Sequence, residues 1–149
     1  MIAALWFGSA AFLIGVAAPA AFRAAPDSTV AADVVGAMLM RWHYLALALP
    51  LILFALLWKR ARAALIVIVF AAIVLAALQA MVDVRIRKVR ASSILPISSL
   101  SRTDPLRRSF GMLHGTSSLL LLLQAIAAGV VVAADTGRNS TATEESYPP

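Results

Sequence analysis

The sequence predicts an all-α polytopic membrane protein, a bundle of four transmembrane helices. Hydrophobic residues make up 62% of the chain and charged residues only 13%, whereas a soluble domain has about 45–50% and about 25%. The apolar residues gather in four long runs without charges instead of alternating with polar residues. Alternation would be needed for a membrane β-barrel. Helices are the other structure that satisfies its own backbone hydrogen bonds in lipid, so we expect helices.

Each apolar run is about as long as a bilayer is thick, since a rise of 1.5 Å per residue makes ~20 residues enough to cross ~30 Å of hydrocarbon. The runs predict helices over residues 2–22, 30–58, 63–85 and 105–134. Pro26-Asp27-Ser28 is a start signal for the second helix. Thr103-Asp104-Pro105 supplies an N-cap and a first-turn proline for the fourth.

The chain therefore divides into two parts. Residues 1–134 form the transmembrane domain, and the polar residues 135–149 are expected to form a flexible tail. The first run is expected to remain as a transmembrane helix, because it lacks the basic leading segment of a signal peptide and its apolar stretch is too long. The chain has no cysteine, which excludes disulfides and thiolate metal sites.

The basic residues predict how the chain is oriented. Four crossings place the segments after the first and third helices on one side, with nine Lys and Arg residues, and the remaining segments on the other side, with four. The positive-inside rule then places both termini outside and the basic segments in the cytoplasm. The Lys and Arg residues give the chain an overall charge of +6, and those on this basic face are expected to contact anionic lipid headgroups. No nucleic-acid recognition motif accompanies it, so we expect no nucleic-acid partner.

The first helix carries small residues at alternating spacings of four and three. Such a seam lets two helices approach closely in lipid. The seam consists of Ala4, Gly8, Ala11, Gly15 and Ala18. Its partner is either another helix of this chain or a helix of another membrane protein, and both alternatives are open.

Polar residues are expected to converge at the inner end of the bundle. His43 and His114, the two histidines of the chain, lie where the second and fourth helices enter the apolar region. The third helix ends on the same side with two polar residues spaced i, i+4 on one face. The expected cluster comprises Arg41, His43, Gln79, Asp83, His114 and Ser117, with Asp83 paired to Arg41 or Arg87.

Several interpretations of this cluster are open. The histidines can be hydrogen-bonded interfacial residues, and Asp83 can belong to a structural ion pair. His43 and His114 can instead bind a haem iron from facing helices, or a transition metal together with Asp83. A polar substrate or proton path is a further alternative. The expected state is no cofactor and no metal, and the sequence contains no catalytic motif, so we expect no enzyme.

Three segments carry a family resemblance: LWFGSAAFLIGVAAPAAFR in the first helix, RWHYLALAL in the second and DPLRRSFGMLHGTSS in the fourth. Over roughly residues 1–134 the chain resembles a bacterial four-helix membrane family of unknown function, similar to transmembrane-protein-205-like proteins. The chain departs from that pattern at Leu121, where an asparagine is common. The resemblance implies the same topology and a bacterial inner-membrane location, and it implies no established activity.

Two functions of different kinds follow. The favoured one is a small non-catalytic accessory subunit that packs in a larger membrane complex of respiratory or photosynthetic type, with other membrane-protein subunits as partners. It is favoured because the polar residues lie at the edge of the span and because transporter-like internal repeats are absent. The alternative is a small transporter or a metal- or haem-handling protein that uses the inner-edge His/Asp cluster.

Overall fold

The computed structural model describes residues 1–58 and 62–144, of which 135–144 are described by their backbone alone. Its elements in chain order are α1 (Ile2–Phe12), the π-helical segment η1 (Leu13–Ala17), α2 (Ala18–Ala24), α3 (Ser28–Leu57), α4 (Ala63–Ala91), the 3-10 segment η2 (Ile97–Ser99) and α5 (Pro105–Glu144). Four spans in the described residues are long and apolar enough to cross a membrane: Ile2–Ala24, Ser28–Leu57, Ala63–Ala91 and Pro105–Ala134. The predicted all-α four-helix fold is confirmed.

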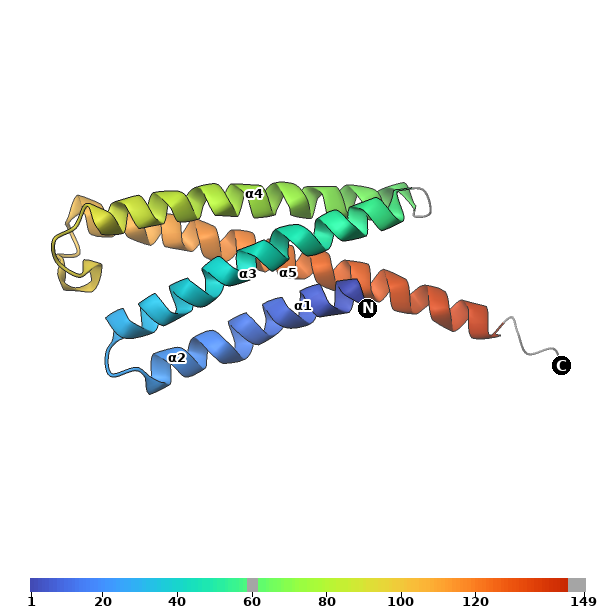
Figure 1. Ribbon diagram of the computed structural model, residues 1–149, viewed down its shortest axis with the longest axis horizontal. Helices are drawn as coiled ribbons and strands as arrows, with labels where there is room; N and C mark the ends of the chain where they lie inside the picture. The colour runs from blue at the N-terminus through green and yellow to red at the C-terminus, as the bar shows by residue number, and fades with distance from the viewer. Residues whose placement is uncertain (59–61, 145–149) are drawn as a thin grey trace.

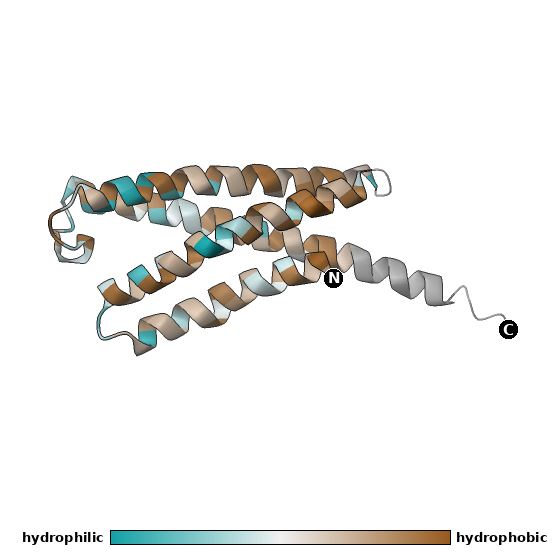
Figure 2. Cartoon of the chain, in the orientation of Figure 1, coloured by the Kyte–Doolittle hydropathy of each residue, from teal (hydrophilic) through white to brown (hydrophobic). Residues whose placement is uncertain are grey.

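The four spans run up and down in sequence and pack as a ring. The α1 helix packs against α3 and α5, and α4 packs against the same two helices from the opposite side. Figure 1 shows that the α2–α3 and α4–α5 connections lie at one end of the bundle, while α1 begins and α5 ends toward the other. We call the first end the basic end, because most of the Lys and Arg residues of the chain lie in the segments that meet there. Figure 2 shows most of the strongly hydrophilic positions of the described chain in that half of the molecule.

Two helices begin at the start signals that the sequence contains. The Asp27 carboxylate accepts hydrogen bonds from the backbone N–H groups of Thr29 (2.7 Å) and Val30 (2.9 Å), which have no partner within α3. The Asp104 carboxylate accepts from the N–H of Leu106 at 2.8 Å and caps α5 in the same way. The predicted start signal of α3 and the predicted N-cap of α5 are both observed.

The first span contains a wider turn at Leu13–Ala17, where the N–H of Ala18 bonds to the carbonyl of Leu13 instead of Ile14. Pro19 follows directly and has no N–H, and in a regular helix its ring would clash with the carbonyl of Gly15. A π-helical turn at this place relieves that clash, so the span continues without a break to Ala24.

Several helices are longer than the apolar runs predict. The α3 helix begins at Ser28 instead of residue 30, and α4 continues to Ala91 instead of 85. The α5 helix does not end at Ala134 but continues to Glu144, where a flexible tail was expected. Once a helix is formed, each further residue adds a hydrogen bond at little cost, and no proline occurs between Pro105 and Pro148. Residues 59–61 and 145–149, which include the basic residues Lys59 and Arg60, lie outside the described part.

Small side chains supply about half of the buried apolar positions, and many large apolar side chains lie on the outside. Alanine supplies many of the buried positions: Ala3, Ala10, Ala46, Ala72, Ala76, Ala125 and Ala128. Large apolar side chains such as Phe12, Leu51 and Phe70 are about half exposed or more. In water such a surface would drive aggregation, whereas lipid tails are suitable neighbours for it. The protein is therefore a multi-pass membrane protein.

The predicted small-residue seam of the first span does not pack within the bundle. Ala4, Gly8, Ala11 and Gly15 are exposed, and Ala18 is half-buried. The face that enters the interior is the neighbouring one, with Ala3, Trp6, Ala10 and Leu13. An added Cβ at Gly8 or Gly15 would meet nothing within 4 Å. Of the two alternatives for the seam, this chain's own helices are excluded as its partner.

Candidate functional site

A histidine and an aspartate form a close hydrogen-bonded pair inside the helix bundle. His43 lies near the middle of α3, and its Nδ1 is 2.7 Å from Oδ2 of Asp83 on α4. The two side chains are only 14% and 18% exposed. An Nδ1–H that donates to a carboxylate leaves Nε2 as the free nitrogen and fixes the orientation of the imidazole ring.

Three more side chains extend this pair across α4 and α5. Ser117 on α5 donates to Oδ1 of Asp83 at 3.2 Å, and Gln79 on α4 donates through Nε2 to the Ser117 hydroxyl at 3.4 Å. Gln124 on α5 donates in turn to Oε1 of Gln79. We call these five residues, His43, Asp83, Ser117, Gln79 and Gln124, the polar chain. All four hydrogen-bond donors point toward Asp83, as expected when an ionised carboxylate is the final acceptor.

Helical spacing explains how the polar chain is assembled. Gln79 and Asp83 are spaced i, i+4 on α4, and Ser117 and Gln124 are spaced i, i+7 on α5, so that each pair lies on one helical face. These faces meet in the interior, where Gln79 and Gln124 are 0% exposed and Ser117 is 6% exposed. The structure thus brings together four of the six residues of the predicted cluster: His43, Gln79, Asp83 and Ser117.

Gln124 was not predicted as a site residue. The signal for it was present, since it is the one polar side chain in the apolar run of residues 119–132. It lies ten residues before Ala134, or about 15 Å along the helix, which is half the thickness of a ~30 Å hydrocarbon core. The polar chain therefore extends from the half of the span near the basic end to its middle, further than the sequence predicted.

Two atoms of the polar chain are buried without a hydrogen-bond partner. These are Nε2 of His43 and Oε1 of Gln124. A buried polar atom without a partner destabilises a fold by about 1–3 kcal/mol. The two atoms mark places where a proton, a water molecule or a polar solute would find an unused hydrogen-bonding group.

A second polar contact joins α1 to α3 beside this pair. The indole Nε1 of Trp42 donates to the Ser9 hydroxyl at 3.1 Å, and that hydroxyl donates to the carbonyl of Trp6 at 2.9 Å. The Trp42 ring lies 6.1 Å from the His43 ring, centroid to centroid. Trp42 thus links the position of His43 to α1. Neither Ser9 nor Trp42 was predicted as a site residue.

The other two predicted members do not join the polar chain. Arg41 is exposed, and Asp83 pairs with His43 instead of Arg41. Arg87, the other expected partner of Asp83, donates instead to the sulfur of Met40 at 3.8 Å. His114 is exposed and its ring stacks on Phe110, with centroids 5.9 Å apart and planes 4° apart.

Helix geometry explains why His114 lies apart from the predicted cluster. His114 is three positions before Ser117, which places the two side chains about 60° apart around α5. The expected convergence of both histidines is therefore not observed. Among residues 1–58 and 62–134, no group of three or more His, Asp or Glu side chains is arranged to hold a metal ion. The expected absence of a cofactor stays a prediction, and a haem or metal bound by the histidines stays the alternative to it.

These features define the class of the protein: a four-helix, multi-pass membrane protein with an ionisable pair and a polar chain inside the bundle. Comparison with protein-family models, curated proteins and solved structures finds no match to this chain. The resemblance to transmembrane-protein-205-like proteins stays a prediction.

Proposed function

We propose that the protein is a small non-catalytic transporter that passes protons across a bacterial inner membrane, with His43 and Asp83 as the proton-binding pair. The observation that carries this proposal is the polar chain, which connects that pair to the middle of the span and leaves two buried atoms unpaired. Ionisable residues within transmembrane segments are functional candidates by default.

A purely structural role accounts less well for the same residues. Hydrogen bonds between transmembrane helices contribute ~0.6 kcal/mol on average. Each buried polar atom without a partner costs about 1–3 kcal/mol, so the unpaired His43 Nε2 and Gln124 Oε1 offset most of the stabilisation from the four contacts. Leucine at these positions would provide packing without that cost. A polar chain that stabilises the bundle so little supports a functional role.

The chemistry of the pair suits reversible proton binding. With Nδ1–H donated to Asp83, the Nε2 lone pair of His43 can accept a proton, and the carboxylate stabilises the imidazolium that forms. Release of a proton from either nitrogen restores the neutral ring. Ser117, Gln79 and Gln124 keep polar groups in place between this pair and the middle of the span.

The sequence favoured an accessory subunit because the predicted polar residues lay at the edge of the span. Gln124 changes that balance, because it is fully buried and brings the polar groups from the basic end to the middle of the span, about 15 Å from Ala134. Protons moving along this path would enter from the basic end, which we propose to be cytoplasmic, with both termini in the periplasm.

The proposal is tested with purified protein in liposomes that contain a pH-sensitive dye. An imposed membrane potential should drive proton entry in the wild-type protein, and His43→Ala and Asp83→Asn should each abolish most of the flux. His114→Ala is the matched control, because it removes the other histidine from an exposed position outside the polar chain. A wild-type flux equal to that of empty liposomes, or an equal loss in the control, contradicts the proposal.

A second candidate function is the accessory subunit of a larger membrane complex, respiratory or photosynthetic in type. The exposed seam of the first span favours it, because the small size of Gly8 and Gly15 serves no contact within this chain. If the seam packs against a subunit of such a complex, Gly8→Leu and Gly15→Leu should release the protein from a complex isolated in mild detergent. Gly36→Leu is the control, since this α3 glycine also has open space around it.

A further inference from the structure

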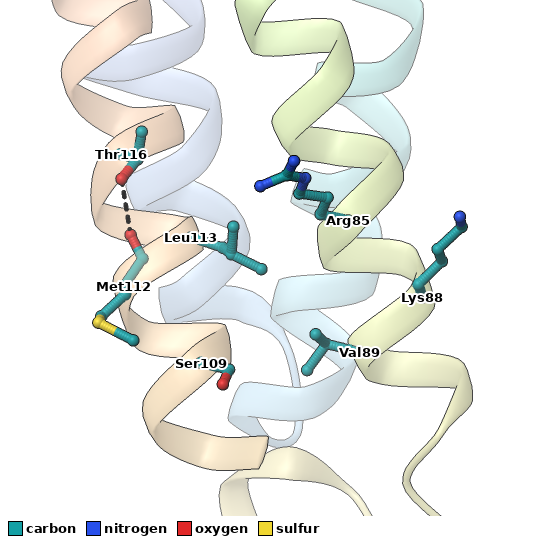
Figure 3. Close-up of a pocket in the computed structure, with 7 residues that line it drawn as sticks. All are labelled: Arg85, Lys88, Val89, Ser109, Met112, Leu113 and Thr116. Atoms are coloured by element: carbon teal, nitrogen blue, oxygen red, sulfur yellow. Dashed lines mark hydrogen bonds between the residues drawn. The ribbon is translucent and has the colours of Figure 1, made fainter. Parts of the chain in front are cut away.

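A groove lies between α4 and α5 toward the basic end of the bundle, separate from the polar chain. Its volume is about 430 Å³. Seven residues line it: Arg85, Lys88, Val89, Ser109, Met112, Leu113 and Thr116. Figure 3 shows the Arg85 guanidinium directed from α4 toward α5, whereas the Lys88 ammonium extends outward at the rim. Two cations, hydroxyl groups and apolar side chains therefore share one groove.

Among the side chains that the structure describes, no acidic group pairs with the cations of the groove. Within residues 1–58 and 62–134, Asp83 pairs with His43 and Asp33 pairs with Arg90. The remaining two acidic side chains there, Asp27 and Asp104, accept hydrogen bonds at the N-termini of α3 and α5. All four acidic side chains of residues 1–58 and 62–134 are thus engaged elsewhere, and none of them neutralises the charges of the groove.

The unused polar groups of the groove are hydrogen-bond donors. Arg85 offers five N–H groups in a planar fork that fits two oxygens of a phosphate, and Lys88 offers three. Thr116 is not among these donors, because its hydroxyl already donates to the carbonyl of Met112 at 2.9 Å (Figure 3). A lining of cationic donors without any carboxylate selects an anion.

The apolar part of the groove points to the kind of molecule that carries the anion. Met112 is 69% exposed, and with Leu113 and Val89 it forms an aliphatic wall. Arg85 lies six residues before the end of α4, or about 9 Å along the helix. The groove therefore lies on the side of a membrane-spanning helix pair, close to the level of lipid headgroups.

We propose that this groove is a binding site for an anionic phospholipid. The phosphate is held by Arg85, with the Ser109 hydroxyl as a further donor and the Lys88 ammonium adding positive charge at the rim, and an acyl chain lies along Met112 and Leu113. A basic pocket between transmembrane helices is a known way to bind anionic headgroups. The site is independent of the proposed proton path, because none of its residues belongs to the polar chain.

Native mass spectrometry of the full chain in dodecyl maltoside micelles tests the proposal by counting bound lipids. Dioleoyl phosphatidylglycerol should bind to the wild-type protein, and dioleoyl phosphatidylcholine should bind at least tenfold more weakly. Arg85→Ala should weaken phosphatidylglycerol binding by about tenfold, as expected for the loss of charge-assisted hydrogen bonds. The Arg85 side chain is exposed, so this substitution should leave the fold intact.

The control variant is Arg23→Ala, which removes one exposed positive charge from α2 outside the groove. It should leave phosphatidylglycerol binding unchanged. Equal weakening in both variants would mean general charge attraction without a site, and would overturn the proposal. Displacement of the lipid by millimolar inorganic phosphate would overturn it as well, because it would identify the site as one for soluble phosphate.

Discussion

The contact between His43 and Asp83 can be measured as a coupling energy. The change is a double-mutant cycle with His43→Ala, Asp83→Ala and the double variant. Each single substitution removes the 2.7 Å contact and leaves the other partner buried without it. The cycle separates the energy of the pair from the other effects of each substitution.

The expected magnitude follows from the burial and the chemistry of the pair. A hydrogen bond to a charged group contributes about 1.5–3 kcal/mol, whereas contacts between transmembrane helices reach at most ~1.7 kcal/mol. Both side chains are more than four-fifths buried, at 14% and 18% exposed, so screening by water is limited. We expect a coupling energy of about 1–2 kcal/mol.

The assay is unfolding of the purified protein in mixed micelles by added sodium dodecyl sulfate, followed by tryptophan fluorescence. Trp42 is a suitable reporter because its ring lies 6.1 Å from that of His43. The control cycle pairs Asp83→Ala with His114→Ala, and these effects should add within about 0.3–0.5 kcal/mol. A coupling of that size or less between positions 43 and 83 would refute the contact on which the proposed function rests.

Three further predictions concern packing, topology and capping. Gly129→Leu should destabilise the fold by about 1–3 kcal/mol in the same unfolding assay, because a Cβ there already meets the Phe7 side chain at 3.3 Å. Gly8→Leu should leave the stability of the isolated chain unchanged, because a Cβ there meets nothing within 4 Å. Because the chain has no cysteine, Ile94→Cys and Trp58→Cys each introduce a single labelling site. An impermeant thiol reagent added to intact cells should modify position 58 and leave position 94 unmodified. The opposite pattern would reverse the proposed orientation. Asp104→Ala should cost about 0.5–2 kcal/mol of stability in thermal unfolding, because it removes the N-cap of α5.

The proposals for the polar chain and the groove are separable by experiment. Proton flux depends on His43 and Asp83, whereas binding of phosphatidylglycerol depends on Arg85 and Lys88. Flux without specific lipid binding would support the transporter and overturn the lipid site, and the reverse result would do the opposite.

The helices and their starts could be predicted from local patterns. A charge-free run of about 20 residues is already long enough to cross a bilayer. The caps at Asp27 and Asp104 depend on groups only two or three residues away. The end of α5 could not be predicted from hydropathy. Hydropathy shows where the apolar run ends, but it does not show whether the polar residues that follow are helical or form a flexible tail.

The candidate site was predicted in part for a geometric reason. The i, i+4 spacing placed Gln79 and Asp83 on one face, and the order of crossings placed His43 and Ser117 at the same end. Sequence proximity to Ser117 suggested His114 as well, but a rotation of about 60° around α5 turns that side chain outward. Gln124 was overlooked because it lies in the middle of an apolar run.

By itself, the sequence determined that the chain crosses a membrane four times and that its basic segments gather at one end, because span length and charge distribution are local properties. Only the tertiary structure decided which face of each helix points inward. It turned the Ala4–Gly15 seam outward, paired Asp83 with His43 instead of an arginine, and linked Gln124 to Gln79. The physical reason is that periodicity identifies the faces of a helix but not their rotation, and in lipid both small and large apolar faces can point outward at little cost.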